Sequence, residues 1–194
     1  MSPPNLDFLL GEVRQLNGTV RAGGSQAIEA FHRLTNRLLH LTVLRTGETV
    51  KLIRLAGNPT RAALQSRTAD EPLRLNDGGF LRLSARLFLD LSSEPHYLKV
   101  EDISYQYQLD SEGRQWIFRY DYLRNPPHAY PASHFQIRGS LREQEAAGGR
   151  PLEKFHFPTG RVSLEAVVRL LIEQFNVQSR QPSAIWRPLK ISRP

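Results

Sequence analysis

Apolar and polar residues alternate through the middle of the chain, a pattern typical of strands that bury one face. Over residues 80–91 every second residue from Leu81 onward is apolar, and Arg82 and Arg86 lie between them. Because alternate side chains of a strand point to opposite faces, this segment predicts a strand with one buried and one exposed face. Strands are also expected over residues 103–109, 116–122, 133–141 and 155–157.

Helical spacing of apolar residues appears near both ends of the chain. Residues 25–39 predict an amphipathic helix capped by Ser25, and residues 163–175 predict a closing helix capped by Ser163. His32 and His40, on and just after the first helix, are expected to be structural.

The remaining segments carry weaker patterns. Residues 41–44 and 50–55 predict a hairpin, and residues 56–77 predict a loop with one short helix near Arg61. Residues 1–24 predict no element, because glycines at 18, 23 and 24 interrupt any long one.

These elements predict an α+β fold. We expect an antiparallel sheet of about five to seven strands, with an N-terminal and a C-terminal helix packed on one face. Residues 1–176 would form a single domain, in which 1–77 are the least determined part, and 177–194 a basic C-terminal arm that binds a partner.

Charge is uneven along the chain. The net charge is +7, from 9 − 4 = +5 for residues 1–68, 7 − 10 = −3 for 69–125 and 10 − 5 = +5 for 126–194. This balance favours a polyanionic partner, nucleic acid before membrane. The chain has no cysteine, no signal peptide and no apolar stretch of membrane-spanning length, so we expect a cytoplasmic protein without disulfides or thiolate metal sites.

Two histidines and several arginines suggest phosphodiester chemistry in the second half of the chain. Cleavage without metal needs a base, an acid and cations for the developing charge, and His134 and His156 are the candidates for proton transfer. We expect His134, Gln136 and Arg138 to share a solvent-reachable face, while Phe135 and Ile137 pack inward. Five further residues are candidates for substrate binding: Arg119, Asp121, Arg138, Thr159 and Arg161.

Other interpretations fit the same residues. Histidines on strands are more often hydrogen-bonded scaffolding, and Arg119 with Asp121 is more often a same-face ion pair. Tyrosines at 105, 107 and 120 are more often sheet packing than platforms for base stacking. A metal site of His134, His156 and Asp121 ranks lower because nearby arginines oppose a cation, and no cofactor is expected.

Several short motifs follow one another between residues 105 and 175. They are Tyr-Gln-Tyr at 105–107, the Asp-Ser-Glu-Gly turn at 110–113, Phe-Arg-Tyr-Asp at 118–121, a Pro and His loop, a second histidine strand and a closing Leu-Glu-x-Val-Val helix. This succession resembles the TumE-type toxins of bacterial type II toxin–antitoxin modules. The resemblance implies that Arg119, Asp121, His128 and His134 occupy the family's polar positions.

Two functions are therefore expected. The first is a toxin-like, metal-independent ribonuclease, or another nucleic-acid-acting enzyme, of a bacterial defence or toxin–antitoxin system. The second is a non-catalytic subunit of a larger bacterial complex that binds nucleic acid or protein. Expected partners are RNA, and an antitoxin or other protein.

Overall fold

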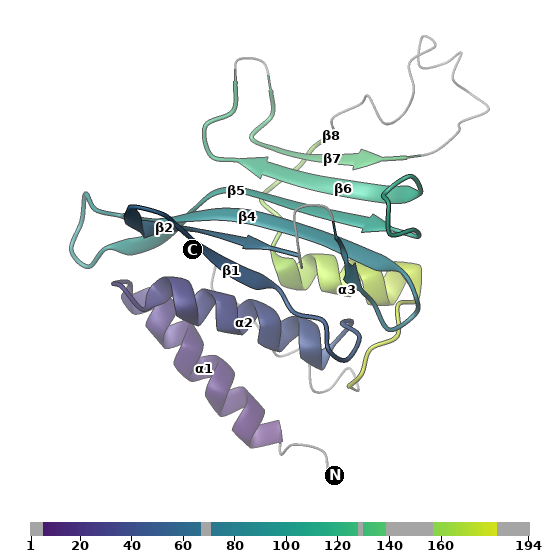
Figure 1. Cartoon of the computed structure of the whole chain (residues 1–194), viewed down its shortest axis with the longest axis horizontal. Helices are drawn as coiled ribbons and strands as arrows, with labels where there is room; N and C mark the ends of the chain where they lie inside the picture. The colour runs from purple at the N-terminus through teal and green to yellow at the C-terminus, as the bar shows by residue number, and fades with distance from the viewer. Residues whose placement is uncertain (1–5, 67–70, 128–129, 139–156, 182–194) are drawn as a thin grey trace.

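The computed structural model of the chain describes residues 6–66, 71–127, 130–138 and 157–181 (Figure 1). They form three helices and an antiparallel sheet of eight strands, so the expected α+β class is confirmed. The elements are α1 (Leu6–Ala22), α2 (Ala27–Leu41), β1 (Lys51–Leu55), β2 (Asn58–Gln65), β3 (Leu73–Arg74), β4 (Phe80–Asp90), β5 (Tyr97–Gln108), β6 (Trp116–Leu123), β7 (Ser133–Ile137), β8 (Phe157–Pro158) and α3 (Leu164–Phe175).

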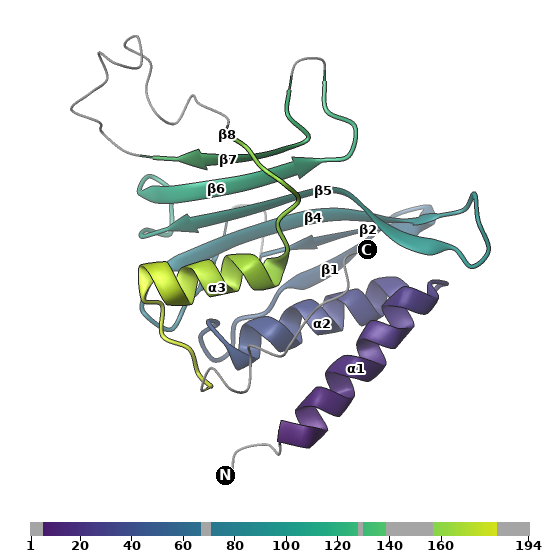
Figure 2. The same ribbon diagram turned by 180° about the vertical axis from the view of Figure 1, so that it is seen from behind.

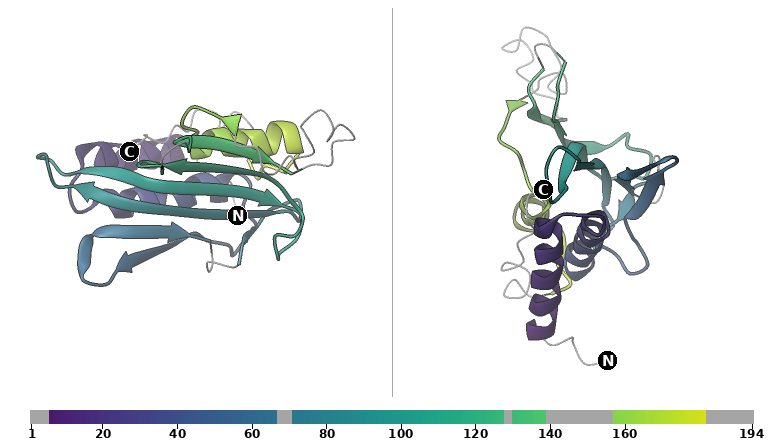
Figure 3. Two further views of the ribbon diagram at one scale, coloured as in Figure 1. Left: turned by 90° about the horizontal axis from the view of Figure 1, so that it is seen from above. Right: turned by 90° about the vertical axis from the view of Figure 1, so that its left-hand side faces the viewer.

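The helices cover one face of the sheet. The strand order is β1-β2-β4-β5-β6-β7-β8, with β3 beside β4, so nearly every strand pairs with its neighbour in sequence. Figure 2 shows α3 in front of the strands and α2 below them, and Figure 1 looks at the opposite side. The view from above in Figure 3 also places α3 on one side of the strands. We call the side without a described helix the open face.

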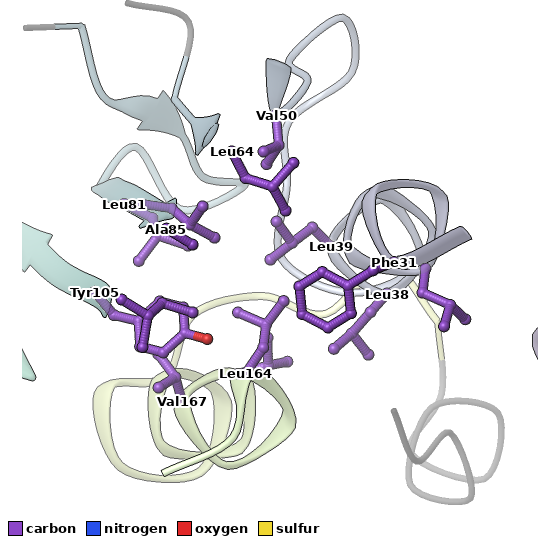
Figure 4. Close-up of a cluster of buried hydrophobic side chains, with 14 of the residues drawn as sticks. Phe31, Leu38, Leu39, Val50, Leu64, Leu81, Ala85, Tyr105, Leu164 and Val167 are labelled. Carbon is purple, nitrogen blue, oxygen red and sulfur yellow. The ribbon is translucent and has the colours of Figure 1, made fainter. Parts of the chain in front are cut away.

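Strand alternation builds the core between the sheet and the helices. On β4, Leu81, Leu83 and Ala85 are buried toward the helices, and the residues between them belong to the open face. Figure 4 shows part of this core, in which the Tyr105 hydroxyl points into an apolar cluster from α2 and α3. Burial raises the pKa of this phenol. Tyr107 and Tyr120 are buried as well, so the three tyrosines serve packing, not base stacking.

Polar side chains of α2 contact the segment that leads into β1. The carbonyl oxygen of Val50 lies 2.8 Å from His32 Nε2 and 3.0 Å from Asn36 Nδ2, and the Val50 amide donates to Asn36 Oδ1 at 2.8 Å. His40 Nε2 lies 2.7 Å from the Glu48 carbonyl oxygen. These contacts give both histidines the structural role expected of them, because they attach the segment that leads into β1 to α2.

The N-terminal third differs most from expectation. The predicted hairpin of 41–44 with 50–55 is wrong, because α2 continues to Leu41 and β1 pairs with β2. The predicted loop over 56–77 is also wrong, since 58–65 form β2. Ser25 does not cap α2, whose N-cap is Gln26 without a side-chain bond. An unexpected helix, α1, packs Val13, Leu16 and Val20 into the core despite its two glycines.

The chain stays packed on the domain after α3. Ser163 caps α3 as predicted, by accepting from the Ala166 amide. Val177 is buried, the Arg180 amide donates to the Thr42 carbonyl oxygen at 2.8 Å, and the Asn76 side chain donates to the Gln178 carbonyl oxygen at 2.9 Å. The first residues of the expected C-terminal arm therefore contact the domain, and residues 182–194 lie outside the described part.

A glycine turn between α1 and α2 makes a close contact with the loop before β5, which yields a stability prediction. Gly23 and Gly24 both have positive φ, but only at Gly23 would a Cβ lie 2.7 Å from the His96 carbonyl oxygen. We expect Gly24→Ala to cost about 1–2 kcal/mol in unfolding free energy through backbone strain alone. Gly23→Ala should cost distinctly more, because the two segments must also separate. Urea denaturation of both variants measures this, and equal losses would contradict the close contact.

The Asn36 contacts yield a second prediction. Asn36→Ala removes the side-chain partners of the Val50 amide and of the Thr49 hydroxyl. Leaving such groups unpaired should lower the free energy of unfolding by about 1–3 kcal/mol. Arg33→Ala, at an exposed position of the same helix, is the matched control and should stay within about 0.5 kcal/mol. Thermal and urea denaturation would refute this account if both variants behaved alike.

Candidate functional site

Polar residues line up in register across the open face. One row joins Arg82, Gln106, Arg119 and Gln136 from β4 to β7, and a second joins Ser84, Ser104, Asp121 and His134. In each row, adjacent residues are cross-strand partners, and partners on one face of a sheet come within about 5.5 Å. The alternation found in the sequence therefore assembles one polar surface from four strands.

Three of the expected site residues contact one another on this surface. Asp121 Oδ2 accepts a hydrogen bond from Arg119 Nε at 2.7 Å and lies 3.4 Å from His134 Nε2. Exposure falls steeply across the cluster: the side chains of Arg119, Asp121 and His134 are 41%, 18% and 3% exposed. The arginine therefore faces solvent while the histidine lies at the bottom.

His134 is buried, which corrects the expectation that its ring is reachable by solvent. Its Nδ1 lies 3.4 Å from the Pro131 carbonyl oxygen, and the Tyr130 ring meets it edge-on with centroids 5.5 Å apart. On the strand's outer side, Pro158 of β8 pairs with it. The loop before β7 and the strand beside it thus enclose a ring that alternation had correctly placed on the open face.

The neighbours of His134 agree only partly with the expected packing. Phe135 packs inward and stacks on Phe118 at 5.3 Å, as expected, and Gln136 is buried although a solvent-reachable position was expected. Ile137 was expected to pack inward but is 40% exposed. It pairs with Phe118 of β6, but it lies beyond Phe135, the last residue of β7 that pairs with β8, so no described strand flanks it on that second side.

An open depression of about 250 Å³ lies over this cluster. Its polar lining comes from β4, β5, β6, β7 and the preceding loop: Arg86, Asp102, Ser104, Arg119, Asp121, Tyr130 and His134. Arg86 forms an ion pair with Asp102 at one side. Burial raises the pKa of the Asp102 carboxyl, and the bond from Arg86 opposes this rise.

The other predicted residues lie apart from the cluster. Thr159 is exposed, and its amide donates to the Ser133 carbonyl oxygen at 3.0 Å, which places it beside the start of β7. Arg138 is exposed just past the end of β7. Arg161 belongs to the helix-covered side, where its guanidinium lies 4.8 Å from the centre of the Tyr122 ring. His156 and His128 lie outside the described residues, so the structure does not place them.

Sequence reasoning missed a second cluster on the open face. Phe88 of β4 has the guanidinium groups of Arg61 and Arg124 over its ring, at 5.8 and 5.7 Å from the centroid. Phe88 occupies a position of the alternating β4 pattern that falls on the polar face. A phenylalanine at such a position is the signal in the sequence that could have indicated this cluster. Arg61 could not be placed because β2 had been predicted as a loop.

Among the described residues, no group of three or more histidines and carboxylates could hold a metal ion. The alternative set of His134, Asp121 and His156 is only partly described, because it includes His156. The described helices are all too short or too polar to cross a membrane.

No protein-family model matches the chain, and no curated protein or solved structure is significantly similar to it.

The burial of His134 predicts a structural cost for its removal. His134→Ala withdraws one partner from Asp121 and leaves space beneath Tyr130, so we expect the free energy of unfolding to fall by about 1–3 kcal/mol. Ile137→Ala, at an exposed position of the same strand, should change it far less. Urea denaturation of the two variants is the measurement. Unchanged stability in His134→Ala would show that the ring is not part of the packing.

Proposed function

We propose that the chain binds nucleic acid, with RNA as the favoured partner, through the open face of its sheet. The observation that carries this proposal is the set of exposed guanidinium groups gathered there from separate strands. Arg61, Arg86 and Arg119 have side chains that are 45%, 60% and 41% exposed. Backbone phosphates are the partner that such a surface suits best.

The carboxylates on this face orient the arginines without using all of their donors. Glu101, Asp102 and Asp121 each pair with one of the three arginines. A guanidinium has five N–H donors, so a single carboxylate leaves others for a phosphate. Holding the side chain in place beforehand also reduces the conformational entropy lost on binding.

The rest of the surface supports the same partner. Serine hydroxyls at 84 and 104 and the side-chain amide of Gln106 lie between the arginines, and such neutral groups commonly contact phosphate and sugar oxygens. The net charge of +7 would attract a polyanion over longer distances. An RNA partner would be met in the cytoplasm, the compartment expected from the sequence.

A second candidate is the metal-independent ribonuclease that the resemblance to TumE-type toxins implies. One observation favours it: Asp121 lies between Arg119 and His134 at the floor of the open depression. A carboxylate can orient a histidine for proton transfer while an arginine stabilises charge on phosphorus. We rank this candidate second because the His134 side chain is only 3% exposed.

Binding can be tested with matched arginine variants. Fluorescence anisotropy with a labelled single-stranded oligoribonucleotide should show binding that weakens with salt. The double variant Arg86→Gln/Arg119→Gln loses two phosphate contacts. Its association constant should therefore depend less steeply on salt: the slope of log association constant against log salt concentration should decrease in magnitude by about 1.4, or about 0.7 per contact. The control Arg33→Gln/Arg169→Gln, on the exposed sides of α2 and α3, should keep the wild-type slope.

Two results would change the conclusion. Equal losses of RNA affinity in both double variants would show that the open face is not the binding surface, provided that the two variants have the same melting temperature. RNA cleavage that persists in a chelator and disappears in His134→Gln, with folding retained, would establish the ribonuclease in place of simple binding.

A further inference from the structure

The cluster around Phe88 carries an inference that rests on the proposed function and makes its partner more specific. Phe88 lies on the open face toward the end of β4, with Arg61 of β2 and Lys99 of β5 as its cross-strand partners. Its ring is half-buried and receives the guanidinium groups of Arg61 and Arg124. An aromatic ring beside cationic side chains is the combination that proteins use to hold unpaired bases next to a phosphate backbone.

Both arginines are held in place by other groups. Arg61 Nη1 lies 3.5 Å from a carboxylate oxygen of Glu101, and Arg124 Nε donates to the Val100 carbonyl oxygen at 2.8 Å. The guanidinium planes are thereby positioned at the ring before any ligand arrives. Planar guanidinium groups also stack on bases, so the cluster offers further flat surfaces beside the phenyl ring.

The cluster continues into the depression described above. Arg86 precedes Phe88 by two residues on β4, so it lies on the same face about 7 Å away. Arg86 also lines the depression that contains Arg119. One nucleic-acid strand could therefore place a base at Phe88 while its backbone follows Arg86 toward Arg119.

We infer that the nucleic acid bound by the open face is single-stranded and that one of its bases stacks at Phe88, beside Arg61 and Arg124. Bases inside a duplex are already stacked and paired, so they cannot reach an aromatic ring on a sheet surface. A single strand has free base faces, and stacking tolerates any base because each has a π face.

The test uses a fluorescein-labelled oligouridylate and an RNA duplex of the same length, measured by anisotropy. Wild-type protein should bind the single strand more tightly than the duplex. Phe88→Leu keeps apolar bulk but removes the ring, and should weaken single-strand binding about tenfold, the usual effect of losing one stacked base. Phe80→Leu is the control, because Phe80 is a half-buried phenylalanine at the other end of the same strand and face.

A stacking readout separates this role from a general loss of affinity. A single strand that contains 2-aminopurine should change its fluorescence on binding to wild type and to Phe80→Leu, and should not change it when saturated with Phe88→Leu. Equal affinity for duplex and single strand, or a fluorescence change with Phe88→Leu as large as with wild type, would overturn the inference while the proposed function stands. Absence of binding to either nucleic acid would overturn both.

Discussion

One-sided burial of the antiparallel sheet is the constraint on which the rest of the structure depends. The apolar residues of β4 and β5 recur at every second position, so each strand has one row of apolar side chains that must be buried. The helices α2 and α3 cover this row. The same alternation leaves every other residue on the open face, where none of the described helices covers it. A register shift of one residue would exchange the two sets, so burial of the core fixes the positions of Arg119 and Asp121.

Polar side chains hold other groups in place at two parts of the fold. Before the first edge strand, α2 uses His32, Asn36 and His40 to bond backbone groups of Glu48 and Val50, which attaches the segment that leads into β1. On the open face, carboxylates pair with arginines while leaving them exposed. Surface pairs of this kind contribute little to stability. In the proposed function, they orient the guanidinium groups for the nucleic acid.

Much of this architecture could be predicted from the sequence, and the failures have physical causes. The strong alternation of β4 to β6 and the Ser163 cap of α3 appear in the sequence itself. β2 was not predicted, because residues such as Pro59 and Ala63 interrupt any regular alternation of apolar and polar positions. Its pairing with β1 and β4 holds this segment in the sheet. The face of His134 was predictable, but its burial depends on a loop and a strand that no local pattern reveals. The Phe88 cluster joins three separate segments and needs their register.

The most direct test of the binding surface is NMR of the arginine Nε–Hε groups during titration with a short single-stranded oligoribonucleotide. Each arginine gives its own signal, so the measurement shows which guanidinium groups meet the ligand. We expect shifts for Arg61, Arg86, Arg119 and Arg124 on the open face, with Arg33 and Arg169 unchanged. Shifts confined to the arginines of α1, α2 and α3 would contradict it.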